Sequence, residues 1–144
     1  MTTVPGMPTG PSRSLDVLLV EDDAQLRDYL SVRLTRLGHR VRDVPDGRAA
    51  LDACREGGRP DVVVTDIFMP EADGLELIRT IMSEFGSIAM VAMSGGSPRV
   101  PADYLPHARM FGAAETLAKP FTTEQLVEAI ERAVARHEAS GRDR

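Results

Sequence analysis

The chain of 144 residues contains one cysteine, no tryptophan and no long apolar run. The lone cysteine, Cys54, excludes an internal disulfide framework and is typical of a reducing compartment, so we expect a cytoplasmic protein. A membrane-spanning helix needs about 18 consecutive apolar residues, and no run approaches that length. The first residues also lack the apolar segment of a signal peptide. These absences exclude a disulfide-rich secreted protein and a membrane protein.

Positive charge is scarce as well. Lysine and arginine together number 17 against 22 acidic residues, which gives a formal net charge of −5. This acidic balance argues against a nucleic-acid partner and against a polybasic membrane-binding patch. Lys119 is the only lysine, and every other basic position is arginine. We therefore expect a compact ammonium, rather than a broad guanidinium, to be required at position 119.

The chain length suits one domain. Residues 1–14 carry three prolines and two glycines without a helical or strand period, which predicts a disordered leader. Residues 15–138 form the predicted folded domain, and residues 139–144 a polar, frayed C-terminal tail.

Short apolar runs alternate with helical periods five times along the domain. We expect strands at 16–20, 39–44, 61–65, 88–93 and 115–118, the second of them polar enough for a sheet edge. Helices are expected at 24–37, 46–55, 75–85 and 122–137, and a weaker fourth helix, interrupted by proline, within 94–112. Continuous apolar strands alternating with helices predict an α/β fold with a parallel sheet covered on both faces.

Polar side chains follow four of these strands: Glu21, Asp22 and Asp23 after the first, Asp66 after the third, Ser94 after the fourth and Lys119 after the fifth. Ligands of such sheets bind at the carboxyl ends of the strands, so we expect these side chains to lie close together. Crowded carboxylates need a cation, and oxygen ligands without His or Cys suit Mg²⁺. A lysine and a hydroxyl bind phosphoryl oxygens, and a carboxylate can attack phosphorus. The set predicts phosphoryl transfer onto an aspartate.

The same residues carry a family resemblance. The runs Val-Leu-Leu-Val-Glu-Asp-Asp at 17–23, Asp-Ile-Phe-Met-Pro at 66–70, Asp-Gly at 73–74, Ser-Gly-Gly at 94–96 and Lys-Pro-Phe at 119–121 resemble a response-regulator receiver domain. The resemblance covers about residues 15–137. It implies a flavodoxin-like, doubly wound fold with five helices and a five-stranded parallel sheet in the order 2-1-3-4-5.

The resemblance also implies roles for individual residues. Asp66 would be the phosphoacceptor, and Glu21 and Asp22 would hold Mg²⁺ together with Asp66 and the backbone carbonyl of Phe68. Ser94 and Lys119 would contact the phosphoryl group. The bond between Lys119 and Pro120 is a candidate cis peptide.

One position departs from the family pattern. Thr116 stands where the family usually has tyrosine or phenylalanine, so a switch based on the rotation of an aromatic ring is not expected here. We expect the proline-containing segment 97–110 to absorb the change that follows phosphorylation.

These observations predict a single-domain response regulator that accepts a phosphoryl group from a sensor histidine kinase or a histidine phosphotransfer protein. We expect no output domain after the last helix, so the downstream target would be another protein. The fourth and fifth helices are the candidate surface for a homodimer. Catalysis would be limited to its own phosphorylation and slow autodephosphorylation.

Three alternatives belong to other classes. A pseudo-receiver would have the fold without productive phosphorylation. A hydrolase with an aspartyl-phosphate intermediate would need a second aspartate two residues after Asp66, where the chain has Phe68. A flavin carrier would need a Ser/Thr-rich loop where three acids follow the first strand. We further expect Cys54 in the core and His39, His107 and His137 on the surface.

Overall fold

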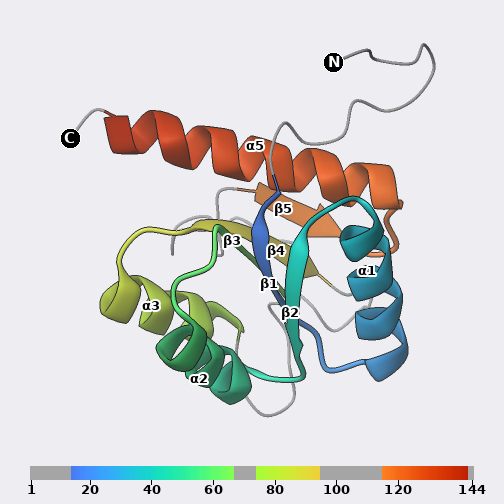
Figure 1. Cartoon of the computed structure of the whole chain (residues 1–144), viewed down its shortest axis with the longest axis horizontal. Coiled ribbons are helices and arrows are strands. Elements are labelled where there is room, and N and C mark those ends of the chain that lie inside the picture. The colour runs from blue at the N-terminus through green and yellow to red at the C-terminus, as the bar shows by residue number, and fades with distance from the viewer. Residues whose placement is uncertain (1–13, 67–73, 95–114, 143–144) are drawn as a thin grey trace.

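A computed structural model describes residues 14–66, 74–94 and 115–142 of the chain. Its centre is a parallel sheet of five strands: β1 (Asp16–Val20), β2 (Arg40–Val44), β3 (Val62–Asp66), β4 (Ala89–Ser94) and β5 (Glu115–Ala118). The strands lie in the order β2-β1-β3-β4-β5 (Figure 1). Every neighbouring pair is parallel. The predicted fold class and strand order are confirmed.

The burial of the strands follows their composition. All residues of β3 and β4 are buried, because apolar side chains on both faces are covered by helices. β2 carries exposed arginine and aspartate and lies at one edge of the sheet, as its polar sequence predicts. The phosphoacceptor candidate Asp66 thus ends a central, fully buried strand.

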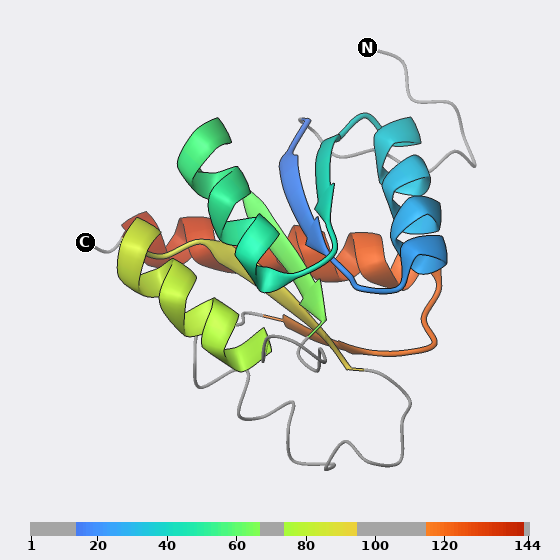
Figure 2. The same ribbon diagram turned by 90° about the horizontal axis from the view of Figure 1, so that it is seen from below.

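Four helices flank the sheet in the described ranges: α1 (Ala24–Arg36), α2 (Gly47–Gly57), α3 (Gly74–Phe85) and α5 (Thr123–Arg142). Helices α1 and α5 cover one face, and α2 and α3 cover the other (Figures 1 and 2). The fourth helix expected within 94–112 lies outside the described residues. Of the helices that the structure describes, none is long and apolar enough to cross a membrane.

The starts of α1, α2 and α5 are set by side-chain caps. Asp23 Oδ1 accepts bonds from the N–H groups of Gln25 (3.0 Å) and Leu26 (3.3 Å) at the start of α1. Asp46 caps α2, and a reciprocal pair between Thr122 and Gln125 begins α5. α5 continues to Arg142, past the expected end at residue 137, and residues 138–142 contain no proline.

One histidine departs from expectation. His39 is 5% exposed, and its Nδ1 accepts a bond from the N–H of Leu15 (3.2 Å), so its predicted surface position is wrong. The chain reverses at Gly38, whose φ of 99° is accessible to glycine, and this turn directs the next side chain inward. His137 is half-buried beside the Ser87 carbonyl (2.8 Å), and His107 lies outside the described residues. Cys54 is buried, as predicted, and burial raises the pKa of its thiol.

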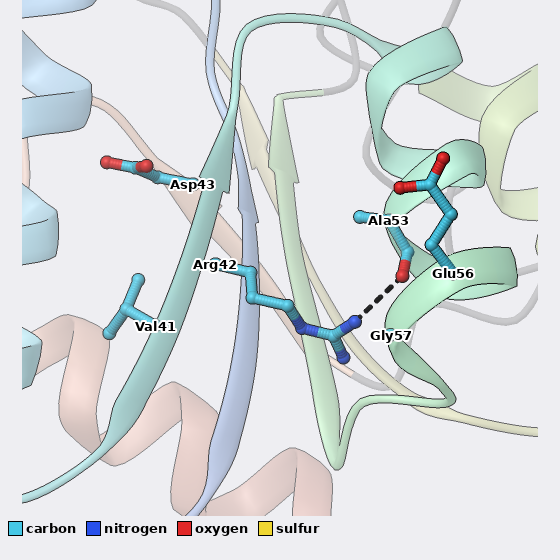
Figure 3. Close-up of a pocket in the computed structure, with 6 residues that line it drawn as sticks. All are labelled: Val41, Arg42, Asp43, Ala53, Glu56 and Gly57. Carbon is cyan, nitrogen blue, oxygen red and sulfur yellow. Dashed lines mark hydrogen bonds between the residues drawn. The ribbon is translucent and has the colours of Figure 1, made fainter.

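Arg42 connects the edge strand β2 to α2. Its Nη1 donates to the carbonyl of Ala53 (2.9 Å), and its Nε pairs with Asp16 (3.2 Å). An open cleft of about 470 Å³ lies beside it, and Arg42 points across that cleft toward α2 while Asp43 points to the other side of the strand (Figure 3). A Cβ on Gly57 would lie 2.7 Å from Nη1, so a side chain at this position would displace the guanidinium.

Candidate functional site

Three carboxylates converge at the carboxyl edge of the sheet. Glu21 directly follows β1, and Asp66 ends β3, the neighbouring parallel strand. One oxygen atom from each of Glu21, Asp22 and Asp66 lies within 4.8 Å of the other two. Glu21 and Asp66 are buried, whereas Asp22 is exposed. The structure thus brings together the three acidic side chains that the sequence singles out.

Lys119 joins this cluster from the end of β5. Its Nζ lies 3.0 Å from Asp66 Oδ2 and also donates to Glu21 Oε1. The peptide bond between Lys119 and Pro120 is cis, as the sequence suggests. The single lysine of the chain therefore pairs with both buried acids.

Burial and pairing act in opposite directions on these groups. Burial raises the pKa of Glu21, and the bonds to Lys119 only partly offset this effect. Burial alone would lower the pKa of Lys119, but the bond to Glu21 and the charge of Asp66 outweigh it and raise the pKa. Lys119 therefore remains charged beside the two buried acids.

Ser94 and Thr116 occupy neighbouring strands near this edge. Ser94 is the last residue of β4 and is 8% exposed. Its carbonyl accepts the N–H of Lys119 (2.8 Å), which ties the ends of β4 and β5 together. Thr116 is half-buried in β5, opposite Ala92 of β4. Phe68, whose carbonyl was expected to bind the cation, lies outside the described residues.

The backbone of Glu21 is held by contacts that sequence reasoning missed. Its N–H donates to the carbonyl of Val44 (3.1 Å), and its carbonyl accepts a bond from Arg27 Nη1 (2.8 Å). The N–H of Asp23 donates to Glu21 Oε2 (3.2 Å). The available signal in the sequence was Arg27 itself, a basic residue in the first turn of a helix.

A groove of about 320 Å³ opens beside Lys119, between α1 and the start of α5. Its walls are largely apolar and include Leu26, Tyr29 and Phe121. Tyr29 is 53% exposed, and Arg33 stacks over its ring. Lys119 thus contributes both to this groove and to the acidic cluster.

The chemistry of the donor set identifies the cation that fits. All three candidate ligands are carboxylates, and no histidine or cysteine belongs to the cluster among the residues described. Hard oxygen ligands suit Mg²⁺, which retains several of its own waters, whereas Zn²⁺ prefers nitrogen and sulfur. The exposed side of Asp22 leaves space for such waters. The residues present therefore fit Mg²⁺.

A doubly wound sheet in the order 2-1-3-4-5 defines a flavodoxin-like domain. Its carboxyl edge carries acids that can bind a cation and a lysine that can bind an anion. The family described as "Response regulator receiver domain" matches residues 17–131. The chain belongs to this family. Receiver domains typically bind Mg²⁺ through acidic residues, and they take phosphoryl groups from histidine kinases.

Several relatives support this assignment. Over 136 residues the chain is 36% identical to the transcriptional regulatory protein PdtaR of Mycobacterium tuberculosis, covering 89% of this chain and 63% of that protein. It is 34% identical to the DNA-binding transcriptional regulator NtrC of Azospirillum brasilense over 82% of this chain and 24% of that protein. The chain thus spans less than two thirds of the length of these relatives.

Solved structures agree in fold. FixJ-N superposes with a TM-score of 0.74 at 30% identity, covering 85% of this chain and 95% of that one. The chemotaxis response regulator CheY4 of Vibrio cholerae gives a TM-score of 0.72 at 26% identity, covering 84% of this chain and 99% of that one. Both matches span most of the described sheet and helices.

Proposed function

We propose that this receiver domain accepts a phosphoryl group on Asp66 from the phosphohistidine of a sensor histidine kinase or a histidine phosphotransfer protein, and signals through a partner protein. The observation that carries the proposal is the convergence of three carboxylates within 4.8 Å, with Lys119 bound to Asp66. Glu21, Asp22 and Asp66, with the carbonyl of Phe68, would hold Mg²⁺.

Asp66 has the properties of the nucleophile. It ends a buried strand, and Lys119 Nζ donates to its Oδ2 at 3.0 Å. A carboxylate oxygen of Asp66 attacks phosphorus, the P–N bond to the donor imidazole breaks, and the imidazole leaves with the bonding electron pair. The product is an acyl phosphate on Asp66. Bound Mg²⁺ supplies positive charge to the oxygens of the transferred group.

Lys119 and Ser94 would contact the phosphoryl group once it is formed. The ammonium already lies 3.0 Å from Asp66, so it is placed to pair with added negative charge. The Ser94 hydroxyl lies at the end of the adjacent strand and can donate to a phosphoryl oxygen. Thr116 has no aromatic ring that could move together with the Ser94 hydroxyl. The conformational change after phosphorylation would therefore be taken up by the segment after Ser94.

The groove beside Lys119 supports a protein as phosphodonor. Its apolar walls and the exposed Tyr29 offer a surface on which a helix could pack while presenting histidine at the edge of the sheet. A small anion alone would gain little from such walls. The groove therefore favours a phosphorylated protein over a free metabolite as the physiological donor.

The test of this function is the intact mass after incubation with Mg²⁺ and a small phosphodonor such as acetyl phosphate. The wild type should gain one acid-stable, base-labile phosphoryl group, and Asp66→Asn should gain none. Asp43→Asn, which changes an exposed aspartate on the edge strand, is the matched control and should be labelled normally. Undiminished labelling of Asp66→Asn would refute the assignment, and a wild type that binds no Mg²⁺ would favour a pseudo-receiver.

A further inference from the structure

Arg27 occupies a position where a basic residue is unfavourable. α1 begins at Ala24, and the N–H of Arg27 donates to the carbonyl of Asp23 (2.9 Å), so Arg27 lies in the first turn. The N-terminus of a helix carries partial positive charge, so a cation there is unfavourable. α1 has no acidic residue within its first turn, and the carboxylate of its N-cap, Asp23, already accepts two backbone N–H bonds. A compensating interaction is therefore expected.

The guanidinium provides that interaction with the backbone ahead of the helix. Side chains on a helix lean toward its N-terminus, which directs Arg27 back over the loop that precedes α1. Its Nη1 donates to the carbonyl of Glu21 at 2.8 Å. This carbonyl belongs to the peptide group that joins Glu21 to Asp22. Arg27 thus holds the link between two of the three clustered carboxylates.

The two carboxylates on this link differ in how firmly they are held. Glu21 is buried, and its carboxylate binds Lys119 and the N–H of Asp23. Asp22 is exposed, so its carboxylate has more conformations to lose when a cation binds. A fixed peptide plane restricts the backbone of Asp22 before binding, and this lowers the cost of ordering its side chain.

We propose that Arg27 is a positioning residue for the Mg²⁺ site, holding the Glu21 carbonyl so that Asp22 is directed at the cation. The inference rests on the Mg²⁺ site of the proposed function. A purely electrostatic role would have the opposite sign, because loss of a nearby positive charge would strengthen the binding of a cation. The direction of the change in affinity therefore separates the two roles.

The first experiment measures Mg²⁺ binding by titration calorimetry without any phosphodonor. Arg27→Met removes the donor and should weaken Mg²⁺ binding roughly tenfold, the lower end of what residues supporting metal ligands contribute. Arg27→Lys keeps a donor on a long chain and should recover most of the affinity. Arg36→Met is the matched control: it removes the same charge from an exposed site in the last turn of α1, where a cation is favourable. It should leave the affinity unchanged.

The second experiment distinguishes positioning from general damage to the fold. The rate of phosphorylation by acetyl phosphate is followed as the Mg²⁺ concentration is raised. Arg27→Met should need roughly tenfold more Mg²⁺ for half-maximal rate and should reach the wild-type maximum. A lower maximum at an unchanged half-saturating concentration would overturn the proposal. Urea unfolding without Mg²⁺ verifies that each variant is folded.

The outcomes also separate this proposal from the function on which it rests. Equal Mg²⁺ affinities of Arg27→Met and Arg36→Met, or tighter binding by Arg27→Met, would overturn the role of Arg27 and leave the function of Asp66 intact. A wild type without measurable Mg²⁺ binding would overturn both.

Discussion

The adjacent residues Asp22 and Asp23 have different roles in the structure. Asp23 caps α1 by accepting two backbone N–H bonds, and Asp22 faces solvent at the acidic cluster. Replacing each by alanine should therefore separate helix stability from cation binding. Asp23→Ala should lower the free energy of unfolding by about 1 kcal/mol, with or without Mg²⁺. Asp22→Ala should change it by less than about 0.5 kcal/mol in the absence of Mg²⁺.

In the presence of Mg²⁺, Asp22→Ala should become the less stable of the two variants. At a concentration 100 times the wild-type Kd, binding should stabilise the wild type and Asp23→Ala by about 2.7 kcal/mol. If loss of the Asp22 carboxylate weakens binding 100-fold, the same concentration stabilises Asp22→Ala by only about 0.4 kcal/mol. The deficit of about 2.3 kcal/mol is well above experimental error.

Urea unfolding followed by far-ultraviolet circular dichroism suits this comparison, because the chain has no tryptophan to report by fluorescence. Asp22→Ala and Asp23→Ala serve as controls for each other, since each removes one negative charge from the same loop. Equal losses of Mg²⁺ stabilisation in the two variants would show that the register of the acidic loop is wrong.

Two further predictions concern structure away from the acidic cluster. Burial lowers the pKa of His39 below its usual 6.5, so the wild type should lose stability as the pH falls below about 6.5, where the unfolded state gains the proton. The free energy of urea unfolding of His39→Asn should depend less on pH, and parallel pH profiles of the two proteins would refute this. Gly57→Ala would place a Cβ 2.7 Å from Arg42 Nη1. The change in unfolding free energy that Gly57→Ala causes should therefore be about 1 kcal/mol more favourable in an Arg42→Met background than in the wild type. A double-mutant cycle without coupling would contradict the contact.

The sequence predicts most of the sheet and much of the site for one physical reason. Parallel strands end at a common edge, so residues that directly follow apolar runs meet there regardless of their distance along the chain. Glu21 and Lys119 are 98 positions apart, yet their side chains bond. Asp66 could be placed in the same way, because an unbroken apolar run marks a central strand.

What escapes the sequence depends on geometry finer than strand order. The burial of His39 follows from the turn at Gly38, and no pattern around a single histidine reports such a turn. The bond from Arg27 to a backbone carbonyl has no sequence signature beyond a misplaced charge. The expected end of α5 is too early, because polar residues are compatible both with a last helical turn and with an unstructured tail.

The unequal exposure of the three carboxylates sets how a cation would be exchanged. Glu21 and Asp66 are buried, while Asp22 is exposed to the surrounding water. On the side that these described residues form, bound Mg²⁺ would therefore enter and leave past Asp22. Exchange would be as fast as water replacement around the ion and rotation of Asp22 permit, so the loaded fraction would track the free Mg²⁺ of the surroundings from moment to moment.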